Sequence, residues 1–106
     1  MTESNYVQEL RSEIAARLPN CDDHLIDLYT LLGLQYGTHV DEVHVHNAWA
    51  VHTNRTRPDH RSLIPFPFLA PEVQALDTKY VEAIRQADRA VYSKHLAAHQ
   101  AKEAAR

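Results

Sequence analysis

Four of the five prolines of this 106-residue chain lie between residues 58 and 71. A regular helix cannot continue through them, because each proline ring fixes φ and removes a backbone donor. Within the segment, apolar side chains such as Leu63 and Phe66 are too frequent for a free linker. We therefore expect residues 53–71 to form an ordered, extended strap that lies against the rest of the protein.

Helical periodicity dominates the chain before the prolines. Apolar residues at steps of three and four, within 7–18 and within 25–32, predict a first helix and a second, more apolar helix. Gly37 suits the end of the second helix. The candidate N-terminal caps are Ser4 or Asn5 for the first helix and Asp22 or Asp23 for the second.

The stretch EVHVHNAWAVH, residues 42–52, fits two periodicities. Its first residues alternate as in a strand, yet His46 and Trp49 share a helical face with apolar neighbours. Thr38 and Asp41 have the spacing of a capping box, and one isolated strand would leave its backbone groups unpaired. These two arguments predict a third helix.

A fourth helix is predicted after the strap, because Pro71 suits a first helical turn and Glu72 complements its positive end. Beyond His95 the chain has strong helix formers but few large apolar groups, so we expect an exposed helical continuation. The predicted core-facing stripe of this helix consists of Val73, Leu76, Tyr80, Ile84, Ala87 and Val91.

Together these elements predict an all-α fold, a small single-domain bundle of about four helices with the proline-rich strap before the last long helix. The predicted domain covers residues 1–98, and residues 99–106 form a frayed tail. The length of the last helix leaves an exposed seam near Tyr92 and Leu96 that can pair with a second copy or a protein partner.

The composition argues against several classes of protein. A formal charge of -3 and a pI near 6.2 do not fit a nucleic-acid-binding domain. Cys21 is the only cysteine, which fits a reducing compartment. The opening residues MTESNYVQEL have no signal-peptide pattern, and no apolar stretch reaches membrane-spanning length. We therefore expect a cytoplasmic protein without membrane or nucleic-acid partners.

A metal site is the first chemical hypothesis, because His39, Glu42 and His46 have the spacing i, i+3 and i+7 and would share a helix face. Imidazole and carboxylate groups are suitable zinc ligands. The segment lacks the HExxH arrangement, however, and no nearby cysteine completes a tetrahedron. We therefore interpret His46 as a hydrogen-bonded neighbour of Trp49 and expect no metal or other cofactor.

An enzyme would need a nucleophile on a sharp turn, or paired carboxylates, facing a cleft. The sequence has only two glycines and contains no GxSxG elbow, P-loop or Rossmann motif. Asp77 lies one turn from Tyr80 on the expected core-facing side, so we expect its carboxyl group to be partly buried. We interpret Asp77 as an acceptor of hydrogen bonds from the strap and predict no catalytic residues.

Positive charge is concentrated between Trp49 and Phe66, where three arginines stand against a single acid, Asp59. Guanidinium groups bind phosphate, and aromatic faces can stack on a base. A solvated loop that only increases solubility explains the same composition equally well. The candidate ligand-binding residues are His46, Trp49, Arg55, Arg57, His60, Arg61 and Phe66.

The segments VHNAWA, residues 45–50, and HRSLIPFPFLAPEVQALD, residues 60–77, together resemble the ryanodine-receptor repeat domain. That family has an aliphatic-His-x-x-Trp-Ala element, followed by a His-Pro-x-Leu-x-Pro-aromatic strap and an acidic helix start. The chain departs from this pattern in a shorter insert and in Arg61, which replaces a proline. The matching positions are Val45, His46, Trp49, Ala50, His60, Leu63, Pro65, Phe66, Leu69 and Asp77.

The resemblance implies a helical fold, a relationship to a small bacterial and phage family, and binding of nucleotides or nucleotide-derived signals. Among the matching positions, we interpret Leu63, Pro65 and Asp77 as structural. We therefore expect a non-enzymatic module that senses or sequesters a phosphorylated or nucleotide ligand. The alternative is a protein-interaction module that forms a homo-oligomer or binds a foreign partner without a small ligand.

Overall fold

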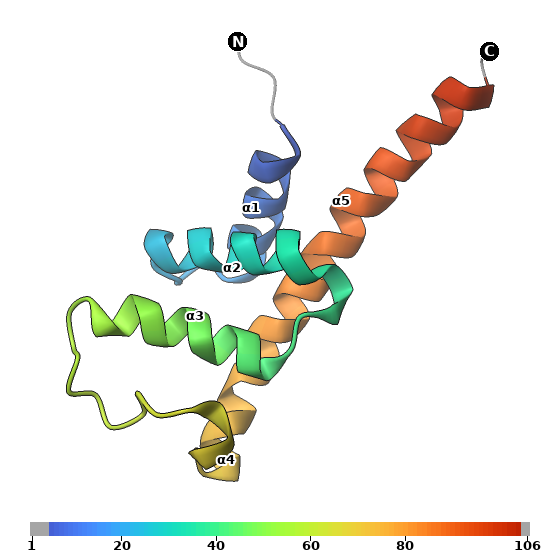
Figure 1. The fold of residues 1–106 in the computed structure, drawn as a ribbon. Helices are drawn as coiled ribbons and strands as arrows, with labels where there is room; N and C mark the ends of the chain where they lie inside the picture. Colours follow the sequence, from blue (N-terminus) through green and yellow to red (C-terminus); the bar gives the residue numbers. More distant parts are fainter. Residues whose placement is uncertain (1–4, 105–106) are drawn as a thin grey trace.

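The computed structural model describes residues 5–104 and confirms the all-α fold class. Within this range the chain forms helices and turns and no strand, so the ambiguous third segment is helical. Figure 1 shows the long last helix crossing the other helices, with the strap at the opposite end from the two termini. The helices are α1 (Tyr6–Arg17), α2 (Asp23–Tyr36), α3 (Glu42–Asn54), the single-turn α4 (Pro71–Gln74) and α5 (Thr78–Ala104).

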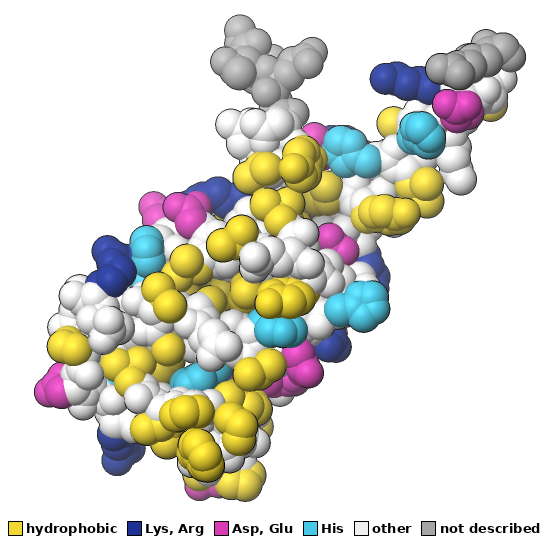
Figure 2. All heavy atoms as spheres, in the orientation of Figure 1, with side chains coloured by type: hydrophobic (Ala, Val, Ile, Leu, Met, Phe, Trp, Pro, Cys, Tyr) yellow, Lys and Arg dark blue, Asp and Glu magenta, His cyan; other side chains and the backbone are white. Residues whose placement is uncertain are grey.

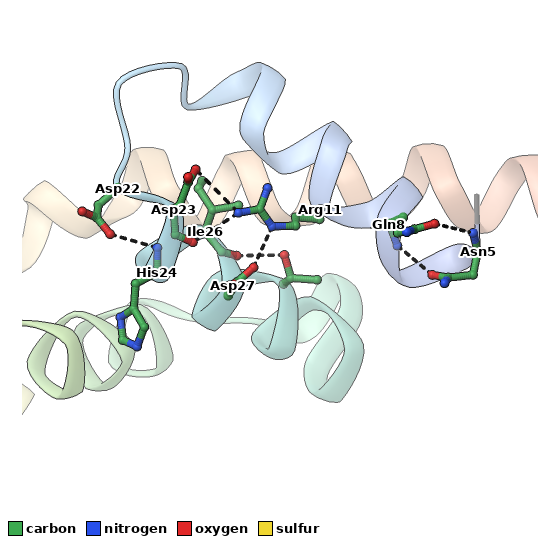
Figure 3. Close-up of polar contacts among 9 residues, drawn as sticks. Asn5, Gln8, Arg11, Asp22, Asp23, His24, Ile26 and Asp27 are labelled. Carbon is green, nitrogen blue, oxygen red and sulfur yellow. Dashed lines mark hydrogen bonds and ion pairs between the residues drawn. The ribbon is translucent and has the colours of Figure 1, made fainter. Parts of the chain in front are cut away.

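The helices α1 and α2 begin at two of the caps that the sequence predicts. Asn5 and Gln8 form a reciprocal capping box, and the Asp22 side chain accepts a hydrogen bond from the His24 backbone N–H (Figure 3). Figure 3 also shows Arg11 of α1 reaching across to α2, where its Nε lies 2.6 Å from Asp27 Oδ1. These groups are solvent-exposed, so the ion pair orients the helices more than it stabilises them.

One hydrophobic core joins all four long helices. Tyr29 of α2 and Ile84 of α5 lie at its centre, both almost completely buried. Because interiors are densely packed, burial of these side chains fixes how α2 crosses α5. The remaining core residues are Leu10, Ile14, Leu25, Ile26, Leu32, Val40, Val45, Ala48, Val81 and Ala87.

The turn between α2 and α3 depends on Gly37, which has a φ of 56° and ends α2 as expected. The capping box of α3 differs from the expected one. Asp41 is the N-cap, and the partner three residues later is His44, whose Nδ1 accepts a hydrogen bond from the Asp41 backbone N–H. Thr38 lies in the preceding 3₁₀ turn η1 (Gly37–His39) and takes no part in it.

The strap is ordered, but it follows a series of turns rather than a single extended path. Its second half contains the 3₁₀ turn η2 (Phe66–Phe68), and Leu69 is buried. The Gln74 side-chain amide of α4 donates hydrogen bonds to the carbonyl oxygens of Phe66 and Leu69. These bonds satisfy backbone carbonyl groups of the strap, which cannot form a regular hydrogen-bond pattern because of its prolines.

The last helix differs from the prediction, because it is not continuous from Pro71. The 3₁₀ turn η3 (Ala75–Asp77) separates α4 from α5. A 3₁₀ turn has about 3.0 residues per turn instead of 3.6, so Leu76 within η3 is rotated relative to the α5 stripe. Leu76 is consequently 66% exposed, whereas Ile84 and Ala87 of the same predicted stripe are buried.

Exposed apolar side chains remain at both ends of the molecule. Figure 2 shows hydrophobic side chains gathered over the end formed by the strap and α4, where Ile64, Phe68 and Leu76 are exposed. At the other end, the C-terminal part of α5 projects beyond the remaining helices (Figure 1). Among residues 5–104, no helix combines the length and apolar character that a membrane span requires.

Replacing Gly37 with alanine should lower the free energy of unfolding by about 1–2 kcal/mol, because L-residues avoid this backbone conformation. The new Cβ would also lie 3.2 Å from an Asp88 carboxylate oxygen. Chemical denaturation measures the loss, with Thr38→Ala at the exposed neighbouring position as the control. Equal stability of Gly37→Ala and the wild type would contradict the role assigned to this turn.

Candidate functional site

His46 connects α3 to the strap. Its side chain is buried, and its Nε2 lies 2.7 Å from the carbonyl oxygen of Ile64. A carbonyl can only accept, so Nε2 carries a proton and donates. The imidazole also lies beside Trp49 and Phe66, with ring centroids 5.6 and 6.0 Å apart. The expectation of a hydrogen-bonded histidine next to Trp49 is therefore confirmed.

The indole of Trp49 is half-buried and connects α3 to a second point of the strap. The His60 ring meets it edge-on at a centroid distance of 5.0 Å. The Ser62 backbone N–H donates to His60 Nδ1 at 3.0 Å, so this nitrogen is unprotonated. His60 is therefore a neutral imidazole with its proton on Nε2, held between the strap backbone and Trp49.

A cavity of about 290 Å³ lies where α2, α3, the strap, α4, η3 and α5 meet. Its walls combine aromatic rings and aliphatic side chains with few polar groups, which is typical of small-molecule sites. The lining residues are Leu25, Tyr29, His46, Trp49, His60, Ser62, Leu69, Val73, Leu76, Asp77 and Tyr80.

Asp77 provides the only carboxyl group in the lining of this cavity. Burial raises the pKa of Asp77 above its ordinary value, and nearby Glu42 adds to the effect while His46 opposes it. The expected hydrogen bonds from the strap to Asp77 are wrong, since no such bond forms among residues 5–104. The strap is held instead by His46 and Gln74, whose side chains donate to its backbone carbonyl groups.

Tyr29 contributes a second polar group to the cavity, and its side chain is only 1% exposed. Burial raises the pKa of the Tyr29 phenol, and the charges of Cys21, Tyr80 and Asp77 add to the effect. The Tyr80 ring lies 5.7 Å away, between centroids. Within the described range the Tyr29 hydroxyl makes no hydrogen bond with another residue, so it can receive one from a ligand.

The structure brings together only part of the predicted ligand-binding set. His46, Trp49 and His60 line the cavity, whereas Phe66 lies beside His46 and lines a neighbouring hollow with Glu42 and Thr78. The side chains of Arg55, Arg57 and Arg61 are all exposed, and none of them lines the cavity. Leu63 and Pro65, predicted to be structural, also lie outside its lining.

Sequence reasoning missed most of the cavity, including Tyr29 and Tyr80. Both tyrosines occur in apolar helical stripes, which predict core positions. Their hydroxyl groups are the signal that could have separated them from ordinary core residues, because a buried phenol needs a polar partner. The missed lining residues are Leu25, Tyr29, Ser62, Leu69, Val73, Leu76 and Tyr80.

The three residues of the metal hypothesis are not brought together on one helix. His39 belongs to η1, and α3 begins only at Glu42. Glu42 accepts a hydrogen bond from the Thr78 hydroxyl, while His46 points to the strap. Residues 5–104 contain no group of three histidine, cysteine, aspartate or glutamate side chains placed to hold a metal ion.

A family model described as Domain of unknown function (DUF7701) matches residues 5–89, and the chain belongs to this family. The resemblance to the ryanodine-receptor repeat domain is therefore wrong as a family assignment. No curated protein and no solved structure matches the chain. The packing of His46 and Trp49 against the strap stands independently of that assignment, because it rests on observed contacts.

Replacing Asp77 with asparagine should raise the melting temperature near neutral pH. The raised pKa of Asp77 means that the folded state disfavours its charged form, so the wild type loses stability as pH rises from 3.8, the ordinary value, through the raised pKa. The asparagine variant lacks this loss. The stability gap should therefore widen with rising pH in that window and then stay constant.

Thermal unfolding of the wild type and the variant across this pH range measures the gap. Asp59→Asn is the matched control, because Asp59 is exposed in the strap and does not line the cavity. A lower melting temperature for Asp77→Asn would instead favour a structural role for the carboxylate.

Proposed function

We propose that this member of the DUF7701 family is a non-enzymatic module that binds a small organic molecule in the cavity beside Trp49. The observation that carries the proposal is the convergence of His46, Trp49, His60 and Asp77 on one hollow of about 290 Å³. This size lies just below the usual range of ligand pockets, which is about 300–1,000 Å³. A single ring with a short side chain fits such a space.

The mixture of groups in the wall supports ligand binding over simple core packing. Aromatic and aliphatic side chains can bury the body of a ligand, and the Asp77 carboxyl and Tyr29 hydroxyl can orient it. Neither polar group has a hydrogen-bond partner within the described part of the chain. Partly buried polar groups without partners lower stability, so their presence is easier to explain if a ligand satisfies them.

The hydrogen bonds around Ser62 favour binding over catalysis. Ser62 is the only serine in the lining, and a serine nucleophile needs a base that accepts its hydroxyl proton. His60 Nδ1 accepts from the Ser62 backbone N–H instead. Among residues 5–104, no hydrogen bond connects the Ser62 hydroxyl to an imidazole or carboxylate. The lining is therefore suited to holding a ligand without altering it.

Nucleotide binding stays a prediction from the sequence. The three arginines offered for phosphate are exposed around the strap, outside the cavity lining. A phosphate group inside the cavity would meet Asp77, and like charges repel. The aromatic walls can accept a base or another ring, so the geometry supports an aromatic ligand more strongly than a phosphorylated one.

Filling the cavity should abolish binding. Val73 lines it from α4, so Val73→Phe places a ring in the space that a ligand would occupy. The matched control is Val51→Phe on α3, where Val51 is 60% exposed and lies outside the cavity lining. We expect Val73→Phe to weaken binding at least about tenfold, or about 1.4 kcal/mol, while the control binds like the wild type.

The measurement is a fluorescence titration, because Trp49 is the only tryptophan of the chain and lines the cavity. The probes are 2-phenylethanol, adenosine and adenosine monophosphate, and calorimetry gives an independent affinity. Circular dichroism establishes that both variants are folded. The absence of a saturable response to any probe at millimolar concentration would overturn the proposal, as would equal binding by Val73→Phe and the wild type.

A second candidate function is self-association through α5. Tyr92 is 66% exposed and Leu96 is 40% exposed on the part of α5 that projects beyond the other helices (Figure 1). Small alanines follow Leu96 and would let a second helix approach closely. The partner that this seam suits best is a second copy of the chain, aligned along the same helix.

Light scattering tests this candidate. The wild type should form a dimer whose population increases with protein concentration, and Leu96→Glu should be monomeric because a charge would be buried in the seam. Glu103→Gln, near the end of α5, is the control and should behave like the wild type. A wild type that remains monomeric at high concentration would exclude self-association through α5.

A further inference from the structure

Within the proposed function, on which this inference rests, the geometry points to a protonated amine as the ligand. We infer that the ammonium group of a small organic cation pairs with Asp77, and that the body of the ligand lies among Trp49, Tyr29 and Tyr80. Such ligands are arylalkyl amines or compact alkyl amines.

The cavity wall is suited to a cation because its charged side chain is acidic. Asp77 is the only carboxylate in the lining, and no lysine or arginine stands among the lining residues. Glu42 lies close enough to affect Asp77 and has the same sign. A half-buried carboxylate without an opposite charge is unfavourable, so a cationic ligand would supply the missing partner.

The two histidines of the wall do not fully supply that partner. His46 donates its Nε2 proton to the Ile64 carbonyl, and this bond keeps that nitrogen directed at the strap. His60 accepts a backbone N–H at Nδ1, so its imidazole is neutral. Because burial outweighs the opposing effect of His46, the pKa of Asp77 remains raised. The carboxylate is therefore still available to a ligand.

The aromatic side chains of the cavity wall independently favour a cationic ligand. The faces of tryptophan and tyrosine rings attract cations, and here Trp49, Tyr29 and Tyr80 surround the same hollow as Asp77. The chain already contains one such contact at this place, since Lys79 Nζ lies 4.9 Å from the centroid of the Tyr80 ring. Lys79 does not line the cavity, so a ligand can use the side of the ring that Lys79 leaves free.

The Tyr29 hydroxyl completes the arrangement. Tyr29, Tyr80 and Asp77 all line the same cavity, and the Tyr29 ring centroid lies 5.7 Å from that of Tyr80. An ammonium group has three donors. It can therefore donate to Asp77 and to the phenol oxygen at the same time, whereas a carboxylate or phosphate has no proton to donate and is repelled by Asp77.

The test uses three probes that share a phenyl ring and differ in their polar end. These are 2-phenylethylamine, which is cationic, 2-phenylethanol, which is neutral, and phenylacetate, which is anionic. Calorimetry and Trp49 fluorescence give their affinities for the intact chain. We expect the amine to bind at least about tenfold more tightly than the alcohol, which corresponds to about 1.4 kcal/mol, and phenylacetate to bind most weakly.

The Asp77→Asn variant identifies the source of this preference. It should bind the amine no more tightly than the alcohol, because the charge that favours the ammonium group is gone. Asp59→Asn removes a carboxylate of the exposed strap and should keep the full preference. Persistence of the preference in Asp77→Asn, or its loss in Asp59→Asn, would overturn the assignment to Asp77.

A pH titration of the wild type gives a test that needs no variant. The affinity for 2-phenylethylamine should fall as pH falls through the raised pKa of Asp77, because protonation removes the charge that pairs with the ammonium group. The affinity for 2-phenylethanol should stay constant in the same window. Parallel pH profiles for the two probes would contradict the inference.

The outcomes also separate this inference from the proposed function. Binding of the alcohol and the amine with equal affinity, lost in Val73→Phe, would overturn the amine preference and support the cavity as a binding site. Tighter binding of phenylacetate would assign the site to anions instead. Failure of all three probes to bind would overturn both the inference and the proposed function.

Discussion

The hydrogen bond from His46 Nε2 to the Ile64 carbonyl fixes the part of the chain that has no regular structure of its own. Proline prevents the strap from forming a continuous backbone ladder, so its position depends on bonds from neighbouring elements. His46 holds it from α3, and Gln74 holds it from α4. Trp49 and His60 then pack in the space that these bonds define.

The cavity is a consequence of that arrangement. Helices α2 and α5 meet in a core centred on Tyr29 and Ile84, but the strap and the interrupted start of the last helix do not fill the space beside it. Asp77 lies at this junction, with its pKa raised by burial. A carboxyl group placed so unfavourably for stability is common at binding sites, where a ligand compensates for the cost.

A short sequence motif can identify residues that pack together without identifying the family of the protein. The pattern around His46, Trp49 and the proline strap correctly indicated residues that pack together, because imidazole and indole rings have specific packing and hydrogen-bonding requirements. The same pattern led to the wrong family, since the chain belongs to DUF7701. Similar local packing occurs in unrelated proteins. A short motif of this kind therefore predicts residue contacts better than it predicts family or function.

The sequence by itself determined the all-α class, the turn at Gly37 and the position of the strap, and it limited the first two caps to Ser4 or Asn5 and to Asp22 or Asp23. All of these depend on side chains and backbone preferences within a few residues. Only the tertiary structure decided that Tyr29, Trp49, Asp77 and Tyr80 share a cavity and that the arginines stay outside it. Such convergence depends on helix crossing and on the 3₁₀ turn before α5, and periodicity along the chain specifies neither.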